Sequence, residues 1–471
     1  MTIDMPTGRT LLQKIWDTHV VLHDDKSGQD LLHVDRLILT DTSSFHAFDL
    51  LRAEGLPVRN PRNIFGGPDH FAASRGPAID DVADEERRAL VRGLANDCAE
   101  YGLGHFGLGD GRMGISHVVG PEQGMTLPGL FLLCGDSHTS THGALGALAF
   151  GMGGGTAHVM ATGCLWVKPL KAMRARVEGK RPFGVAAKDV ILAIIRELGP
   201  AGGFGHVIEY AGSTIEAMTI EERLTVCNMS IEAGARGGLI APDETTFAYL
   251  HGRPMAPRGA QWDAAVAYWR TLRSDPAAAF DREIAIDATA LAPMVSWGNT
   301  AADVVPVDGR VPDPRERADA GERGAMERSL AYMGLEPGMP LAGLPVDQVF
   351  IGSCTNGRIE DLRDAAALLK NRKARVPALV VPGSNVVKAQ AEREGLDRIF
   401  IEAGFTWGHP GCSMCVGTNG DTVAAGQRCM STSNRNFMGR QGPGSRTHLA
   451  SPIMAAAAAV TGRITDVREL L

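Results

Sequence analysis

The sequence predicts an α/β protein in which mainly parallel sheets are flanked by helices. Short apolar runs alternate with amphipathic segments between residues 346 and 404, which is the pattern of strand–helix–strand units. The chain has 471 residues, more than one compact core usually organises, so we expect several domains. Glycine occurs 57 times, which indicates many tight loops, the usual carriers of functional residues.

Five consecutive segments make up this alternation. VDQVFIG (346–352), PALVVPG (377–383) and RIFIEAG (398–404) are short apolar runs that end at glycine, and they predict buried strands. RIEDLRDAAALLKNRK (358–373) predicts a helix because its apolar residues share one face and its last turn is basic. VVKAQAEREGL (386–396) predicts a second helix. Such units build parallel sheets whose sites lie beyond the carboxyl ends of the strands.

The whole chain divides into three units and a linker. Residues 1–171 alternate apolar runs with loops rich in glycine and histidine. Residues 172–287 start a second unit, in which GVAAKDVILAIIREL (184–198) has apolar residues at helical spacing. Residues 288–323 predict a surface linker, since 301–323 is rich in proline and charge, and residues 324–471 form the last unit.

Charge and composition exclude several classes of protein. A net charge of −7 makes nucleic acid an unlikely partner. No apolar run is long enough to span a membrane and the N-terminus lacks a secretory signal, so we expect a cytoplasmic protein. In that reducing compartment the eight cysteines do not form a disulfide framework. Four isolated cysteines are expected to fill the core: Cys98, Cys134, Cys164 and Cys227.

Three other cysteines are expected to meet at one sheet edge. Cys354 directly follows the first predicted strand of the last unit, and Cys412 and Cys415 form a CxxC in the loop after the third. A redox pair has no need of Cys354. A zinc site needs a fourth ligand, which Cys429 or His409 can supply. An iron–sulfur cluster held by three thiolates leaves one metal position open for Lewis-acid catalysis. The residues alone favour the cluster and leave zinc open.

Candidate acids and bases lie in the glycine-rich loops. Asp69–His70 and Asp136–His138 are pairs in which the carboxylate can fix the imidazole tautomer, although such dipeptides are usually capped turns. His117 lies in an apolar run, where a satisfied core histidine is the default. Asn228 and Glu232 share a helix face, as a surface pair also would.

Arginine is concentrated near the C-terminus. No Asp or Glu occurs from Thr422 to Thr465, a segment that contains Arg428, Arg435, Arg440, Arg446 and Arg463. This suits recognition of carboxylate or phosphate, although a solvated basic loop has the same composition. The glycine-rich segment 150–163 resembles a dinucleotide loop, but Thr156 breaks the fingerprint and no clear strand leads into it, so nicotinamide binding is not expected.

Six motifs in order resemble the aconitase superfamily. They are DH, GDSHT, CNMSIEAGA, IGSCTN, PGCSMC and SNRNFMGR. The resemblance covers nearly the whole chain and is greatest to the large subunits of 3-isopropylmalate dehydratases. It implies three aconitase-like domains with a [4Fe–4S] site at their common cleft. The fourth, swivel domain is expected to be absent and supplied by a separate small subunit, together with the catalytic serine and part of the substrate pocket.

The resemblance also implies a role for each motif. Cys354, Cys412 and Cys415 would hold the cluster, whose unligated iron would bind a hydroxyl and a carboxylate of a small dicarboxylate substrate. The acid–base and water-binding network would comprise Asp69, His70, His117, Asp136, His138 and Glu232. The residues near the cluster and the substrate carboxylates would be Asn228, Asn434, Arg435 and Arg440. The reaction would isomerise 2- and 3-isopropylmalate by dehydration to isopropylmaleate and rehydration, as in leucine biosynthesis.

Several positions depart from the usual large-subunit pattern. Phe71 follows the Asp-His pair where asparagine is common, Gly357 stands in CTNGR, and Gly408 and His409 precede PGCSMC where an arginine is often found. None of these removes a ligand or a named acid or base, but they leave open a relative acting on another alkylmalate or a homoaconitate-like acid. A cluster-dependent RNA-binding regulator is the non-enzyme alternative, which the acidic net charge disfavours.

Overall fold

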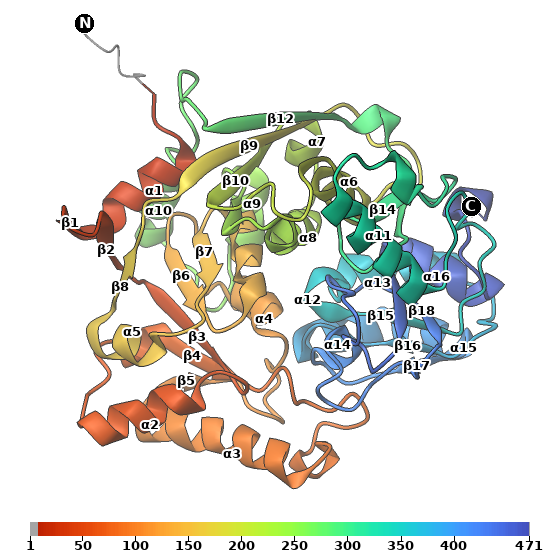
Figure 1. The fold of residues 1–471 in the computed structure, drawn as a ribbon. Coiled ribbons are helices and arrows are strands. Elements are labelled where there is room, and N and C mark those ends of the chain that lie inside the picture. The colour runs from red at the N-terminus through yellow and green to blue at the C-terminus, as the bar shows by residue number, and fades with distance from the viewer. Residues whose placement is uncertain (1–7, 471) are drawn as a thin grey trace, which may run out of the picture.

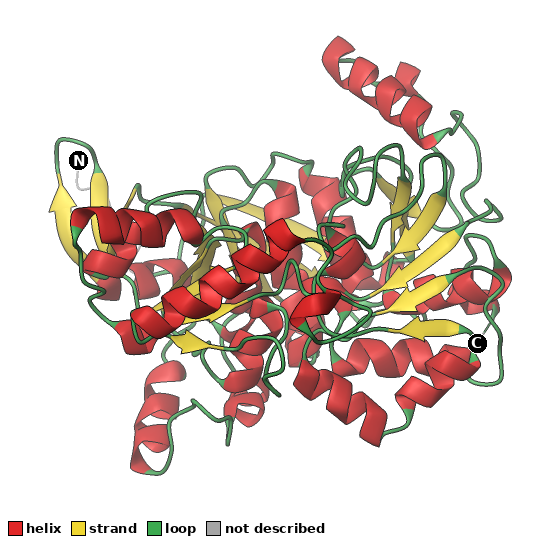
Figure 2. Ribbon diagram, turned by 90° about the horizontal axis from the view of Figure 1, so that it is seen from below, coloured by secondary structure: helices red, strands yellow, loops and turns green. Residues whose placement is uncertain are grey.

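Three parallel β-sheets with helices on their faces organise residues 8–470, which are the residues that the computed structural model describes (Figure 1). The strands lie between layers of helices when the molecule is turned (Figure 2), so the predicted α/β class is confirmed. Among the described residues, no helix is both long enough and apolar enough to cross a membrane.

The first sheet has the strand order β5-β4-β3-β6-β7, and all its neighbouring strands run parallel. Its strands are β3 (Arg36–Thr40), β4 (Ile64–Gly67), β5 (Gly104–His105), β6 (Phe131–Cys134) and β7 (Leu148–Gly151). The strands β3, β4, β6 and β7 are almost wholly buried, as apolar strands covered on both faces must be. The helices of this region are α1 (Leu11–His19), α2 (Phe45–Glu54), α3 (Glu85–Glu100), α4 (Ser116–Gln123) and α5 (Thr156–Thr162).

The second sheet has the order β11-β10-β9-β12, again parallel throughout. Its strands are β9 (Lys171–Glu178), β10 (His206–Ala211), β11 (Gly237–Leu239) and β12 (Arg282–Asp287), and its helices are α6 (Ala187–Leu198), α7 (Ser213–Glu216), α8 (Ile220–Asn228), α9 (Glu244–Leu250) and α10 (Ala260–Trp269). A small antiparallel sheet, β1-β2-β8, lies beside these two and comprises β1 (Val20–Asp24), β2 (Gln29–His33) and β8 (Cys164–Val167).

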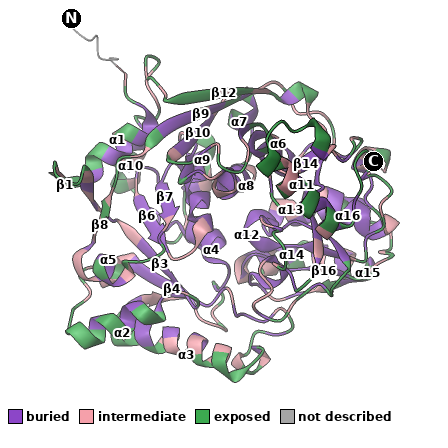
Figure 3. Ribbon diagram, viewed as in Figure 1, coloured by how far each residue is buried: buried purple, intermediate pink, exposed green. Residues whose placement is uncertain are grey.

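The third sheet has the order β17-β16-β15-β18-β19 and is also parallel. Its strands are β15 (Gln348–Ile351), β16 (Ala378–Val380), β17 (Phe405–Trp407), β18 (Arg428–Ser431) and β19 (Arg446–Leu449), and its helices are α11 (Ala320–Met333), α12 (Ser353–Asn356), α13 (Ile359–Leu369), α14 (Asn385–Arg393), α15 (Leu396–Glu402) and α16 (Pro452–Thr461). In the centre of the molecule α4, α8 and α12 are buried where the three sheets converge (Figure 3).

The predicted strand over 398–404 is wrong, because residues 398–402 lie in helix α15. The apolar residues Leu396 and Phe400 are buried at a spacing of four, whereas Ile401 is 55% exposed, so the true period is helical. The third strand after residue 324 is instead β17, which is only three residues long. It still places the CxxC loop after its carboxyl end, as expected.

The segment predicted as a surface linker is only partly exposed. Val304 and Val305 lie in β14 (Val304–Pro306), which pairs with β13 (Met294–Ser296), and Val307 and Val311 are also buried. The prediction that no strand leads into the glycine-rich segment 150–163 is also wrong, since β7 enters it and α5 follows. The departure from the dinucleotide fingerprint at Thr156 stands.

Candidate active site

One cavity brings together ten of the predicted site residues. It is lined by Asp69, His70, His117, Asp136, His138, Cys354, Cys412, Cys415, Asn434 and Arg440, together with Ile115 and Val416. The acidic residues and histidines follow strands of the first sheet or lie on α4, and the cysteines follow strands of the third sheet. Two sheets therefore present their carboxyl ends to a common space.

The three cysteines are held by strained backbone. Cys354 follows Ser353, whose φ is 79°, and Ser413, with φ 49°, lies between Cys412 and Cys415. Within residues 8–470 only one other non-glycine residue, Asn371, has a positive φ. Such conformations cost about 1–3 kcal/mol each and concentrate at functional sites. Two of the three non-glycine residues with a positive φ therefore lie in the cysteine loops.

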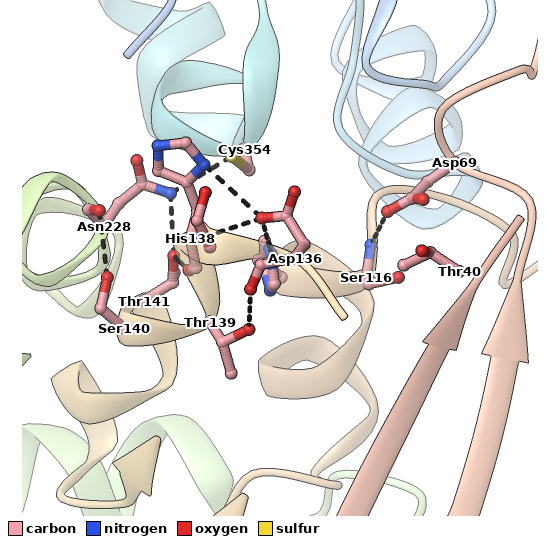
Figure 4. Close-up of polar contacts among 12 residues, drawn as sticks. Thr40, Asp69, Ser116, Asp136, His138, Thr139, Ser140, Thr141, Asn228 and Cys354 are labelled. Atoms are coloured by element: carbon pink, nitrogen blue, oxygen red, sulfur yellow. Dashed lines mark hydrogen bonds and ion pairs between the residues drawn. The ribbon is translucent and has the colours of Figure 1, made fainter. Parts of the chain in front are cut away.

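Amide and hydroxyl donors surround the sulfurs. Asn228 Nδ2 lies 3.2 Å from Cys354 Sγ (Figure 4). Asn434 Nδ2 lies 3.3 Å from the same sulfur. Ser353 Oγ lies 3.3 Å from Cys415 Sγ. Donors of this kind stabilise thiolate and sulfide charge. Asn228 therefore contacts the cysteine site, not the helix-face partner that its spacing to Glu232 suggested.

The electrostatics of the three thiols suit a cation between them. Burial raises the pKa of Cys354 to about 12, and the nearby charge of Cys415 acts in the same direction. Burial also raises the pKa of Cys412 well above its ordinary value. For Cys415 burial acts likewise, but Arg440 and Ser353 bring the pKa below the ordinary value. Three buried sulfurs that repel one another's charge fit a positively charged metal centre.

His70 lies between two carboxylates beside this centre. Its Nδ1 is 2.7 Å from Asp69 Oδ1, and its Nε2 is 3.5 Å from Asp136 Oδ2. Burial opposes protonation, but Asp69, Cys412 and Asp136 hold the pKa of His70 well above its usual range. Ligand atoms of Asp69, His70 and Cys412 all lie within 4.8 Å of one another. His70, with its raised pKa, thus lies directly against the cysteine site.

Asp136 lies at the centre of the histidine network. Its Oδ1 accepts the His138 backbone N–H at 2.7 Å (Figure 4). The same oxygen contacts His117 Nε2 at 2.8 Å. Although burial opposes ionisation, hydrogen bonds from His117, His138 and His70 hold the pKa of Asp136 well below its usual range. The cavity therefore contains a stable carboxylate that faces three imidazoles.

A second group of hydrogen-bonded side chains extends from His138. Its Nε2 is 3.0 Å from Glu232 Oε1, which also receives Arg435 Nε at 2.7 Å. Burial lowers the pKa of His138, but hydrogen bonds to Asp136 and Glu232 outweigh this and leave it raised. Asn228, Glu232 and Arg435 thus reach the site through its lining residues.

Of the five C-terminal arginines, only Arg435 and Arg440 lie at the site. Arg428 is buried against His448 at 2.8 Å, and Arg446 donates to the Tyr332 carbonyl. The arginine-rich stretch is therefore largely structural. The alternative zinc ligands Cys429 and His409 do not line the cavity, and Cys429 packs in an apolar cluster with Phe350.

Sequence reasoning missed two buried polar residues near the site. Asp41 lies 3.4 Å from His70 Nδ1 and accepts the Phe71 N–H. Lys188 donates from α6 to the carbonyls of Thr432 and Ser433, just before Asn434. Asp41 follows a strand end, a position that could have revealed it. No sequence signal reveals Lys188, because its partners are main-chain atoms 244 and 245 residues away.

Comparisons with known proteins identify the family of the chain. The model of the aconitase family (aconitate hydratase) matches residues 13–462. The chain is 54% identical over 468 residues to 3-isopropylmalate dehydratase large subunit 1 of Bradyrhizobium diazoefficiens, covering 98% of this chain and 97% of that protein. The crystal structure of holo aconitase X from Thermococcus kodakaraensis is a distant likeness at 13% identity and a TM-score of 0.46, over 90% of this chain and 89% of that one. Because the family model spans nearly the whole sequence, the chain belongs to the aconitase family.

Proposed function

We propose that this chain is the large subunit of a hydro-lyase that isomerises 2- and 3-isopropylmalate through isopropylmaleate in leucine biosynthesis. One observation carries the proposal: three buried cysteines share a cavity with an arginine, a histidine whose pKa is raised and an aspartate whose pKa is lowered. The near full-length relative supports the substrate, since it is named a 3-isopropylmalate dehydratase large subunit.

Cys354, Cys412 and Cys415 would hold a [4Fe–4S] cluster. No fourth cysteine lines the cavity among residues 8–470, which suits a cluster with one iron free of protein ligands. When bound, such a cluster supplies a Lewis acid for a substrate hydroxyl and carboxylate. Asn228 and Asn434 would stabilise its thiolates through the amide contacts at Cys354.

The proton chemistry falls to the histidines. His70 would give the proton that the departing hydroxyl needs, because its imidazolium is stabilised by Asp69 and Asp136. His117 and His138 would orient Asp136 and bind the released water. A separate small subunit with a swivel domain would supply the catalytic serine and the rest of the substrate pocket.

Arg440 is the better placed carboxylate receptor. Its Nε donates to the Cys415 carbonyl at 3.0 Å, and it forms no ion pair with any carboxylate of residues 8–470. Arg435 already pairs with Glu232 and donates to Ser137 Oγ at 2.8 Å. Arg440 would therefore bind a substrate carboxylate directly, and Arg435 would hold Glu232 while contacting the other end of the substrate.

Metal analysis tests the cofactor. Protein purified without oxygen should contain about four irons and four sulfides per chain, the inventory of one cluster. Cys412→Ser should lose most of this iron, whereas Cys429→Ser should retain it because Cys429 lies outside the cavity. One zinc per chain with no sulfide would overturn the assignment.

Activity assays test the substrate. The chain, reconstituted with its small subunit, should convert 3-isopropylmalate faster than homologous 2-alkylmalates or homoaconitate. Ultraviolet absorbance of the unsaturated intermediate follows the reaction. A preference for another acid would retain the hydro-lyase assignment and reject the leucine pathway.

A further inference from the structure

A buried chain of hydrogen bonds leads away from Asp136 into the protein. His117 Nε2 is 2.8 Å from Asp136 Oδ1, and His117 Nδ1 is 3.2 Å from His142 Nε2. His142 Nδ1 is in turn 2.6 Å from Thr126 Oγ1. Both His142 and Thr126 are completely buried, and neither lines the cavity. The site residue His117 is thus backed by two groups that cannot touch substrate.

While both imidazoles are neutral, the hydrogen bonds from Thr126 to Asp136 can be donated in only one direction. The Asp136 carboxylate can only accept, so His117 Nε2 must carry a proton. His117 Nδ1 is then an acceptor, which requires a proton on His142 Nε2. His142 Nδ1 becomes an acceptor in turn, and only the Thr126 hydroxyl can donate to it. Burial holds the pKa of His142 well below its usual range, which agrees with a neutral ring.

The packing around these hydrogen-bonded side chains is close. Gly120 lies in α4, and a Cβ at this position would come within 2.6 Å of His142 Cε1 and 3.2 Å of Thr126 Oγ1. The His142 ring therefore occupies the space that a side chain at position 120 would need. The His117 and His142 rings also make an edge-to-face contact, with their centroids 5.3 Å apart. This contact supports the hydrogen bond between the two rings.

We propose that Thr126 and His142 are positioning residues that hold His117 as the tautomer with its proton on Nε2, directed at Asp136. The proposal rests on the proposed function for the role of His117. Its consequence is that Asp136 always receives the His117 N–H and is held as the carboxylate that faces His70. A histidine that merely fills the core would satisfy its hydrogen bonds without fixing the tautomer of a neighbour.

Nitrogen-15 NMR of histidine-labelled protein tests the tautomers without any substrate. In the wild-type chain, both His117 and His142 should show a protonated Nε2 and an unprotonated Nδ1, with signals assigned by their loss in His142→Gln and His117→Gln. A proton on Nδ1 of His142 in the wild type would overturn the proposal. The tautomers measured in this way do not depend on which acid the enzyme converts, so this test is independent of the proposed substrate.

Kinetics of the reconstituted two-subunit enzyme test the consequence. Thr126→Val keeps the shape of the side chain and removes the donor, so kcat should fall about ten-fold or more while KM and iron content stay unchanged. Thr126→Ser keeps a hydroxyl and should retain kcat within about two-fold. A kcat for Thr126→Val equal to that of the wild type would overturn the proposal. If the valine variant fails to fold, the tautomers measured by NMR in the wild-type protein still test the proposal.

Discussion

At the scale of single residues, two nearby arginines have different electrostatic surroundings. Arg435 is neutralised by Glu232 at 2.7 Å, whereas the guanidinium of Arg440 faces the cavity and packs 5.2 Å from the Phe437 ring centroid. An arginine without a carboxylate partner keeps its positive charge available for a substrate carboxylate. The two side chains are therefore expected to respond differently to substitution.

Arg440→Gln should lower kcat/KM by about 10- to 100-fold, because a charge-assisted hydrogen bond to substrate is lost. Steady-state kinetics of the reconstituted enzyme would measure this. Arg463→Gln is the matched control, since Arg463 is an exposed arginine of the same C-terminal stretch and lies outside the cavity. Equal activity of both variants would contradict substrate binding by Arg440.

Glu122 is a buried carboxyl away from the cysteines. Its Oε1 accepts from Ser384 Oγ at 2.9 Å, its Oε2 has no partner in the described structure, and burial raises its pKa from 4.5 to about 7. The folded state therefore keeps a proton that the unfolded chain releases above pH 4.5. Folding stability should fall as the pH rises from about 4.5 to 7 and then level off.

Glu122→Gln should remove this pH dependence. The variant should gain stability relative to the wild type between about pH 5 and pH 8, by up to about 3 kcal/mol. Melting temperatures measured across that range would show the gain. Glu86→Gln, at an exposed position, should follow the wild-type profile. A Glu122→Gln variant that loses stability equally at every pH would contradict a protonated Glu122.

At the scale of helices and strands, the distance to neighbouring atoms decides whether replacing a glycine by alanine stabilises or destabilises the fold. A Cβ added to Gly120 in α4 would meet the His142 ring, whereas a Cβ added to Gly93 in α3 would have no other atom within 4 Å. Both glycines are helical, so intrinsic propensity alone would favour alanine at either site by about 1 kcal/mol. Packing reverses that preference at only one of them.

Gly93→Ala should raise the free energy of unfolding by about 0.5–1 kcal/mol. Gly120→Ala should lower it by about 1–3 kcal/mol, because its Cβ would meet His142 Cε1 at 2.6 Å. Chemical denaturation of the two variants under one set of conditions provides the comparison. Stabilisation by both alanines would show that the His142 ring can move aside.

At the scale of the whole molecule, the site depends on contacts between the three sheets. Asn228 from α8 reaches Cys354 on α12, and Thr225 Oγ1 donates to the Thr355 carbonyl at 2.8 Å. Lys188 from α6 ties down the main chain before Asn434 and is fully buried. The second sheet therefore positions residues of the third through buried hydrogen bonds.

Lys188→Met should leave two buried carbonyls unpaired and lower stability by about 1–3 kcal/mol. The loop that carries Asn434 and Arg435 would loosen, so iron content and activity should fall together. Metal analysis and thermal unfolding would measure both effects. The exposed Lys180→Met is the control, and unchanged iron in Lys188→Met would contradict a role for the lysine in holding the site.

The predictions from sequence succeeded where the signal was local. Apolar runs revealed β15 and β16, helical spacing revealed α6 and α13, and strand ends revealed where the cysteines lie. They failed at α15, where β-branched and aromatic residues obscured a helical period, and at the buried valines of the expected linker. The division at residues 171, 287 and 323 stays a prediction.

The sequence by itself determined the fold class, the family resemblance and the identity of the candidate site residues, because strand periodicity and short motifs are local properties of the chain. Only the tertiary structure decided which arginine lacks a carboxylate partner among residues 8–470, how Asp136 faces three histidines, and that Thr126 and His142 stand behind His117. Those facts depend on burial and on distances between atoms far apart along the chain, and no local pattern encodes them.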